Sequence, residues 1–155
     1  YSVECNIYFE KFQIAGLFKT FIHRYLCNNV ATYLYIDNTI SCFAGFLEPG
    51  ETFEQCVQRE VLEESAVTVS EINYLGSQPW PFPASIMIAF EAVTDNPGDA
   101  QGDGEEITEV KWFSREELKA AAADGSLLLP PTISVARKMI EGWLGEVALG
   151  GETWR

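Results

Sequence analysis

The stretch GFLEPGETFEQCVQREVLEESAVTV, residues 45–69, decides the fold and gathers carboxylates in an already acidic chain. Within fourteen residues it holds Arg59 and five glutamates, and four of these matter here, namely Glu51, Glu60, Glu63 and Glu64. Residues three and four apart on a helix share a face, so the last three should project together on its solvent side. Such like charges repel, and hard divalent cations such as Mg²⁺ relieve the repulsion because they prefer carboxylate oxygens. A solvated surface face is the plainer alternative.

The same stretch carries the signals of a helix that follows a turn. Pro49-Gly50 predicts a tight turn, and either Thr52 or Glu51 can cap the helix after it. The apolar positions of a helix at 53–65 fall on one face, and they are Phe53, Cys56, Val57, Val61 and Leu62. We therefore expect this helix to pack on a core while its glutamates stay outside.

Composition limits the class of protein. The chain has 155 residues, 47% of them hydrophobic, which suits one globular domain. Its formal net charge of −13 disfavours long-range attraction to nucleic acid or an anionic membrane, and no apolar run is long enough to span a bilayer. The four cysteines lack C-x-x-C spacing, so we expect neither a zinc ribbon nor a disulfide framework. The chain starts at Tyr1 without a signal peptide, which suggests a fragment.

Strand and helix patterns interleave through the rest of the chain. Strands are expected at 30–36, 67–75, 85–93 and 107–113, and helices at about 115–124 and 134–144. Ser114 and Glu117 form a capping box for the first of these helices, which Gly125 ends. Three prolines make 77–83 unsuitable for the interior of a helix or a sheet. Residues 95–105 predict a polar, glycine-rich loop. We expect one α/β domain with a mixed sheet.

The spacing of Gly45, Glu51 and the run Arg59-Glu60-Val61-x-Glu63-Glu64-x-Ala66-Val67 resembles the Nudix box of the Nudix hydrolase family. The resemblance implies a Nudix fold, with a mixed β-sheet sandwiched by helices in an alpha-beta-alpha arrangement. It also implies a loop–helix–loop that binds Mg²⁺ or Mn²⁺ and cleaves a nucleoside diphosphate linked to another moiety. Glu60, Glu63 and Glu64 are the implied metal ligands, and Arg59 orients them through ion pairs. The general base stays open between Glu63 and Glu64.

One position departs from the family pattern, which has glycine where this chain has Ala66. A residue just past a helix often adopts the left-handed conformation, where alanine costs on the order of 1 kcal/mol. The change removes no metal ligand, so we expect activity to survive it.

A second motif, SQPWPFPAS at residues 77–85, lies ten residues further on. A rigid extended loop whose rings pack on the core is the plainer explanation. The string resembles the SQPWPFPxS signature of the NADH pyrophosphatases, a Nudix branch. The resemblance implies a metal-dependent hydrolase that cuts NAD(H) into nicotinamide mononucleotide and AMP, and that can also remove NAD caps from RNA 5′ ends. Substrate contacts are then implied for Gln78, Trp80, Phe82 and Ser85.

Two further residues enter through the resemblance. Phe46, in the run AGF, matches a phenylalanine that stacks on the substrate ring, with burial in the core as the alternative. Glu106 and Glu109 align with an acidic position that supplies a further metal ligand. We favour Glu106, although a solvated loop carboxylate is the alternative. The lone His23 is assigned no role.

The resemblance covers about residues 41–143. We expect a divergent or truncated segment at 1–40, a catalytic domain at 41–145 and a tail at 146–155. The zinc ribbon that often precedes this domain in the family is not in this chain. A homodimer is implied, and a cytoplasmic location is the default, with the peroxisome or another organelle open.

Two other functions remain open at this point. One is a Nudix hydrolase of ADP-ribose or another nucleoside diphosphate derivative, and the other is an inactive nucleotide-binding Nudix module. The sequence does not decide between NADH, NAD⁺ and NAD-capped RNA, nor between the two metals.

Overall fold

The computed structural model describes the backbone of residues 12–13, 20–22, 26–27, 30–36, 39–41, 43–80, 85–94, 98, 100–102 and 109–145. Side chains are described at 40, 43–79, 86–94, 98, 100–102 and 109–145. The strands in these ranges are β1 (Phe12–Gln13), β2 (Thr20–Ile22), β3 (Leu26–Cys27), β4 (Val30–Ile36), β5 (Thr39–Ser41), β6 (Phe43–Gly45), β7 (Ser70–Trp80), β8 (Ser85–Val93) and β9 (Glu109–Ser114). The helices are α1 (Phe53–Ser65), α2 (Arg115–Asp124) and α3 (Val135–Leu144).

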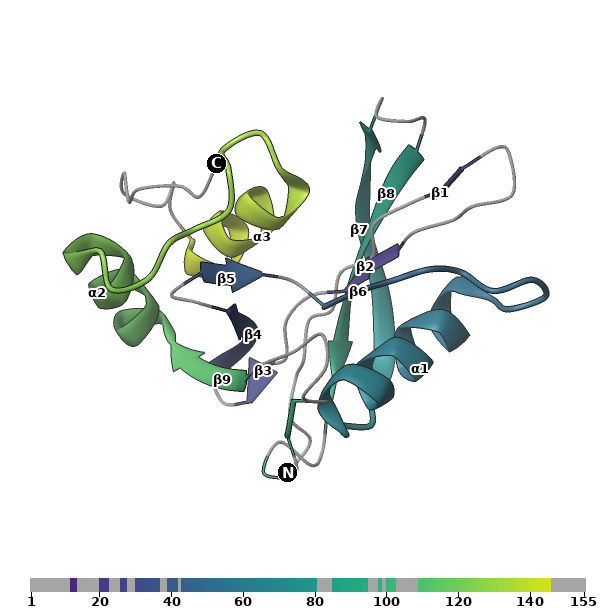
Figure 1. Ribbon diagram of the computed structural model, residues 1–155, viewed down its shortest axis with the longest axis horizontal. Helices are drawn as coiled ribbons and strands as arrows, with labels where there is room; N and C mark the ends of the chain where they lie inside the picture. Colours follow the sequence, from purple (N-terminus) through teal and green to yellow (C-terminus); the bar gives the residue numbers. More distant parts are fainter. Residues whose placement is uncertain are drawn as a thin grey trace.

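The described strands form three groups, and every described pair is antiparallel. One sheet has the order β1-β8-β7, a second pairs β2 with β6, and a third joins β3, β4 and β5, with β9 on β4. Figure 1 shows α1 alongside the long β7–β8 hairpin, while α2 lies beside β9 on the other side of the molecule. The β7–β8 hairpin therefore positions α1.

Helices pack on both faces of β8, because its side chains alternate between the two faces. Cys56 and Val57 of α1 share a buried cluster with Phe90. Met139 of α3 packs on Ala89, the neighbouring residue that points to the opposite face. This arrangement agrees with the expected helix–sheet–helix sandwich.

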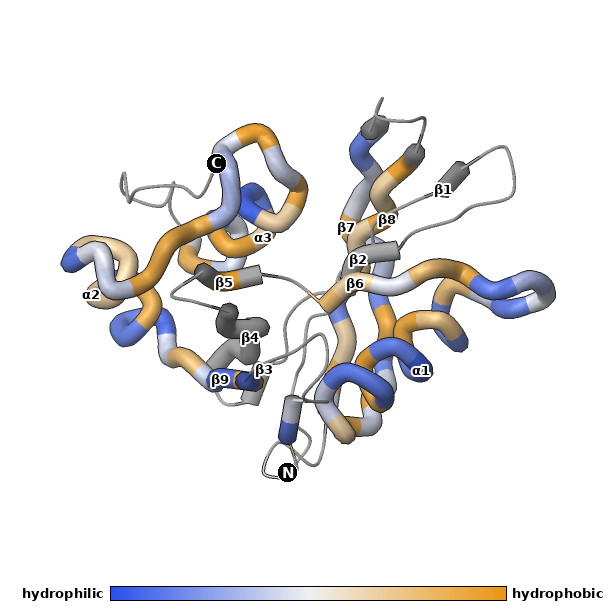
Figure 2. Tube along the Cα trace, in the orientation of Figure 1, coloured by the Kyte–Doolittle hydropathy of each residue, from blue (hydrophilic) through white to orange (hydrophobic). Residues whose placement is uncertain are grey.

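A second buried cluster lies under α2 and α3. It joins Ile40 of β5 to Leu118, Leu127, Leu129 and Ile140. In Figure 2 the segment that leaves α2 is orange, which marks hydrophobic residues, in keeping with the burial of Leu127 and Leu129, and its continuation toward α3 is partly pale blue. No helix in the described ranges is long and apolar enough to cross a membrane.

Most expected elements are present. The strands at 30–36 and 85–93 and the helix at 53–65 have the expected bounds. The capping box of Ser114 and Glu117 is formed, and Gly125 ends α2 in the left-handed conformation. The helix at 134–144 is α3, with Ser134 as its cap. Most of the expected loop at 95–105 lies outside the described residues.

Two expectations are wrong. The start of the proline-rich segment is not a loop, because β7 continues to Trp80 and Pro79 pairs with Ile86 of β8. Proline is tolerated there since β7 is the edge of its described sheet and has one neighbour only. Leu62 was expected to join the buried stripe of α1, but it is 49% exposed.

Candidate functional site

Local interactions fix both ends of α1, the helix that carries the acidic residues. The hydroxyl of Thr52 accepts the Gln55 N–H (3.2 Å), and the Gln55 side chain accepts the Thr52 N–H (2.9 Å). Thr52 is therefore the cap, and Glu51 is left for another contact. At the other end Ala66 has φ 59°, and its N–H donates to the Leu62 carbonyl at 2.9 Å. The expected left-handed conformation of Ala66 is confirmed.

Arg59 is the centre of the acidic cluster. Its Nε and Nη2 donate to the two oxygens of Glu51, each at 2.9 Å. Its Nη1 donates to Glu60 Oε1 at 2.8 Å and to Glu63 Oε2 at 3.1 Å. Nη2 also donates to the Phe46 carbonyl at 2.9 Å. One guanidinium thus ties the loop before α1 to the helix itself, and the fork geometry of arginine permits this number of contacts.

Gly45 makes room for the Glu60 carboxylate. A Cβ on Gly45 would overlap the carboxyl carbon and Oε1 of Glu60, so no other residue fits there without a shift. Glu60 Oε1 also accepts the N–H of Phe46 at 3.0 Å. The first glycine of the motif is thus explained by close approach of a carboxylate to the backbone, and not by a turn.

The three helix glutamates do not share one solvent-exposed face. The Glu63 side chain is 61% exposed, while Glu64 is only 6% exposed and accepts the N–H of Ala44 at 3.3 Å. Glu60 lies between them in exposure. The expectation of a common solvent side is therefore wrong for Glu64, because β6 covers that side of the helix.

Burial and the contacts with Arg59 shift the pKa values of Glu60 and Glu51 in opposite directions. Burial raises the pKa of Glu60, and the hydrogen bond from Arg59 only partly offsets it. Burial also acts to raise the pKa of Glu51, but the hydrogen bonds from Arg59 and the Glu48 N–H outweigh it, so this pKa lies below its ordinary value. The pKa of Arg59 is raised, chiefly by its hydrogen bond to Glu51. The arginine therefore stays charged, and it stabilises the ionised form of both acids.

The carboxylate groups of Glu60, Glu63 and Glu64 are suitable ligands for a hard divalent cation. Carboxylate oxygens are what Mg²⁺ and Mn²⁺ prefer. Among the described contacts, Glu60 and Glu63 each engage Arg59 through one oxygen, which leaves the second for a ligand. In the described part of the chain, no three acidic, histidine or cysteine side chains already converge as a metal centre requires. Arg59 supplies the positive charge here, and the carboxylates would have to turn toward an ion.

The other expected site residues are only partly described. Phe46 is 41% exposed, directly after Gly45, so its ring is not a core residue. Gln78 lies on β7, and its amide NH₂ donates to the Ile133 carbonyl at 2.7 Å. Trp80 and Ser85 face each other across the β7–β8 pair, with the backbone alone described. Phe82 and Glu106 lie outside the described residues.

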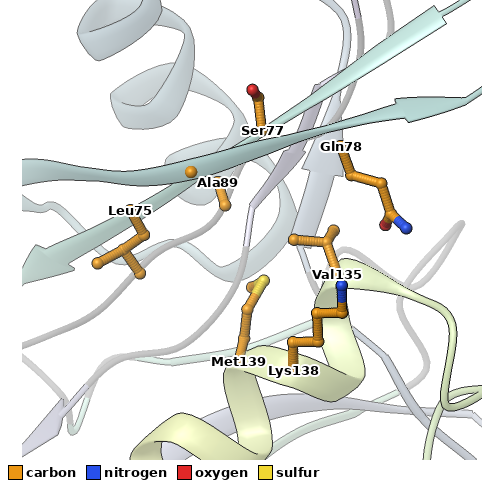
Figure 3. Close-up of a pocket in the computed structure, with 8 residues that line it drawn as sticks. Leu75, Ser77, Gln78, Ala89, Val135, Lys138 and Met139 are labelled. Atoms are coloured by element: carbon orange, nitrogen blue, oxygen red, sulfur yellow. The ribbon is translucent and has the colours of Figure 1, made fainter.

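Residues of α3, the helix that the sequence predicted at 134–144, also line a cleft (Figure 3). The cleft has a volume of about 320 Å³, and Val135, Lys138 and Met139 of α3 form one wall. Gln78 and Leu75 of β7 form the other. No motif marks the α3 residues, and only the approach of β7 to α3 brings them to Gln78.

Comparison with known proteins places this geometry in a family. The model of the NUDIX domain matches residues 29–130. The chain belongs to the NUDIX family. A NUDIX hydrolase from Nitrosomonas europaea has a TM-score of 0.54 at 23% identity, over 76% of this chain and 82% of that one. A NUDIX-family hydrolase from Clostridium perfringens has a TM-score of 0.58 at 18% identity, over 77% and 91%. These two likenesses concern the fold alone.

Curated relatives are similar over most of this chain. A protein of Mycobacterium bovis (strain BCG / Pasteur 1173P2) named NAD-capped RNA hydrolase NudC is 47% identical over 115 residues, which are 69% of this chain and 37% of the relative. A Vibrio cholerae protein of the same name is 46% identical over 68% of this chain and 36% of its own. The NAD-capped RNA hydrolase of Schizosaccharomyces pombe is 44% identical over 66% and 29%. The names of these relatives are in keeping with the branch that the sequence resembles, and the chain spans about a third of their length.

Proposed function

We propose that this chain carries a metal-dependent hydrolase that cuts the pyrophosphate bond of NAD(H) into nicotinamide mononucleotide and AMP, and that it also acts on NAD-capped RNA. The observation that carries the proposal is the Arg59 cluster, in which one guanidinium holds Glu51, Glu60 and Glu63. The names of the relatives support the substrate, because they describe hydrolysis of an NAD cap on RNA.

Each residue has a task in this reaction. Glu60, Glu63 and Glu64 would hold Mg²⁺ or Mn²⁺, and an ion bound there activates water and offsets the charge that grows on the pyrophosphate oxygens. Glu63 or Glu64 accepts the proton of the attacking water. Arg59 orients the carboxylates through its ion pairs. The exposed ring of Phe46, next to Gly45, offers a surface on which a base can stack.

Product analysis tests the proposal. The protein is incubated with NADH, NAD⁺, ADP-ribose and NAD-capped RNA, with Mg²⁺, with Mn²⁺ and with neither, and products are separated by chromatography. Release of AMP together with reduced nicotinamide mononucleotide from NADH, only when metal is present, is the expected result. Cleavage of ADP-ribose but not of NADH would replace this function with that of another Nudix hydrolase. Binding without products in any metal would leave a nucleotide-binding module.

We also propose that the protein is a homodimer, a state implied by the family. Light scattering at several protein concentrations measures it directly. A mass equal to that of one chain at every concentration would refute the dimer without affecting the proposed reaction.

A further inference from the structure

Charge is divided unevenly between the two sides of the molecule. Residues 43–94, which include β6, α1 and the β7–β8 hairpin, contain eight glutamates and one arginine, a formal net charge of −7. Residues 109–145, which include β9, α2 and α3, contain five acidic and five basic residues and are neutral. Figure 1 shows α1 and α2 on opposite sides of the molecule. Within these two ranges, the excess negative charge therefore lies on the side that carries the Arg59 cluster.

The one cation of the acidic side is already engaged by carboxylates. The guanidinium of Arg59 donates to Glu51, Glu60 and Glu63, and its side chain is only 25% exposed. Proteins bind single-stranded RNA largely through lysine and arginine contacts with its phosphates, which release counterions. Residues 43–94 contain no lysine and no other arginine, so they supply no second cation for such contacts.

Half of the glutamates on this side are exposed to solvent, namely Glu48, Glu54, Glu63 and Glu71. Glu48 lies two residues after Phe46, in the loop between that exposed ring and α1. One divalent ion at the Arg59 cluster would change the charge of residues 43–94 from −7 to −5, so its sign would stay the same. The field around the cluster therefore repels a polyanion.

Free NAD⁺ and NAD-capped RNA carry the same cap but differ in total charge. The pyrophosphate is common to both, and each further nucleotide of the RNA adds a phosphate with one negative charge. These phosphates follow the adenosine half of the cap. At low salt, where the Debye length is about 30 Å, several of them lie close enough to the exposed glutamates to be repelled. The repulsion therefore grows with the length of the RNA and is smallest for the free dinucleotide.

We propose that the acidic side of this molecule selects against the RNA chain of a capped substrate, so that free NAD(H) is hydrolysed in preference to NAD-capped RNA at low ionic strength. The inference rests on the proposed hydrolysis of NAD(H), and it names the substrate class of that site. It attributes the discrimination to charge and not to the shape of a pocket, so added salt must reduce the discrimination.

The salt dependence of hydrolysis provides the test. The kcat/KM is measured at constant Mg²⁺ for NAD⁺, for a short NAD-capped RNA and for a long one, from about 10 mM to about 150 mM KCl, over which the Debye length falls to about 8 Å. The ratio of kcat/KM for the long RNA to that for NAD⁺ should be below one at low salt and rise roughly tenfold, with a smaller rise for the short RNA. A ratio that falls with salt indicates phosphate contacts with cations, and it or a constant ratio would overturn the proposal.

Binding of uncapped RNA is a second measurement, and it does not depend on hydrolysis. The fluorescence anisotropy of a labelled single-stranded RNA, without divalent metal, should show no binding at about 10 mM KCl, where attraction to cations is strongest. Binding that weakens as salt rises would refute the inference whether or not NAD⁺ is hydrolysed. A lack of NAD⁺ hydrolysis would refute the proposed function, and the anisotropy would then decide the inference by itself.

Charge variants on the two sides of the molecule locate the effect. Glu48 contacts Glu51 through its backbone N–H (3.0 Å), which a substitution keeps. Glu48→Gln should raise the ratio at low salt about twofold and Glu48→Lys about fourfold, and both gains should vanish at about 150 mM KCl. Glu116→Gln and Glu116→Lys on α2, where Glu116 is also exposed, are the matched controls and should leave the ratio unchanged. Equal gains at the two positions would contradict the inference, because the net charge of the chain would then discriminate, and not the acidic side.

Discussion

Replacing Ala66 by glycine should stabilise the protein, although most substitutions to glycine do the opposite. Ala66 has φ 59° and ψ 14°, a left-handed conformation that costs a residue with a Cβ about 1–2 kcal/mol. The residue is exposed, so its methyl group contributes little burial. Glycine relieves the strain, but it loses about 0.5–1 kcal/mol through the greater freedom of the unfolded chain. The net gain is roughly 0.5–1 kcal/mol.

Thermal and urea unfolding measure this difference. A gain of about 1 kcal/mol corresponds to a rise in Tm of roughly 2–4 °C for a domain of this size. Ala120→Gly is the matched control, because Ala120 is exposed within α2 and has helical backbone angles. It should lose about 1 kcal/mol. If Ala66→Gly and Ala120→Gly change Tm in the same direction, the reasoning is refuted, since the direction of each change depends on the backbone conformation alone. Turnover should not change with Ala66→Gly, because no carboxylate is moved.

Further predictions concern the candidate site and the N-terminal cap of α2. Gly45→Ala should lower both Tm and activity because the added Cβ overlaps the Glu60 carboxylate, while Gly142→Ala, with open space around it, should raise Tm in the same unfolding assay. Glu64→Gln should reduce kcat about 100-fold or more while substrate binding persists, and unchanged kcat in steady-state kinetics would count against the metal assignment. Glu117 has a pKa below its ordinary value because it accepts the cap N–H of α2. It therefore stabilises the fold above the unfolded pKa and loses that effect as pH falls through the folded one, so Glu117→Gln should flatten the decline in Tm below about pH 5.

Much of the local structure follows from short-range signals. The bounds of α1 follow from Thr52 at the cap and an apolar stripe with helical spacing. The end of α2 follows from Gly125, for which the left-handed conformation carries no steric cost. The same reasoning failed at Pro79, since whether a proline interrupts a strand depends on the neighbours of that strand. Pairing between distant segments is not encoded in the residues beside the proline.

The candidate site likewise has features that the sequence predicted and features that depend on the tertiary structure. The resemblance implied that Arg59 orients the glutamates through ion pairs, and ion pairs with Glu51, Glu60 and Glu63 are present. The burial of Glu64 was not expected, because it depends on β6 crossing that side of the helix. For Trp80, Ser85, Phe82 and Glu106, the expected substrate and metal contacts stay predictions.

By itself the sequence determined the family, the helix that carries the carboxylates and the arginine that binds them, because these depend on residues close along the chain. The tertiary structure alone decided that Gly45 lies under the Glu60 carboxylate and that α3 approaches Gln78 to form a cleft. Both contacts join residues that are far apart in the sequence. The packing of helices on two faces of one sheet brings such residues together, and no local pattern records it.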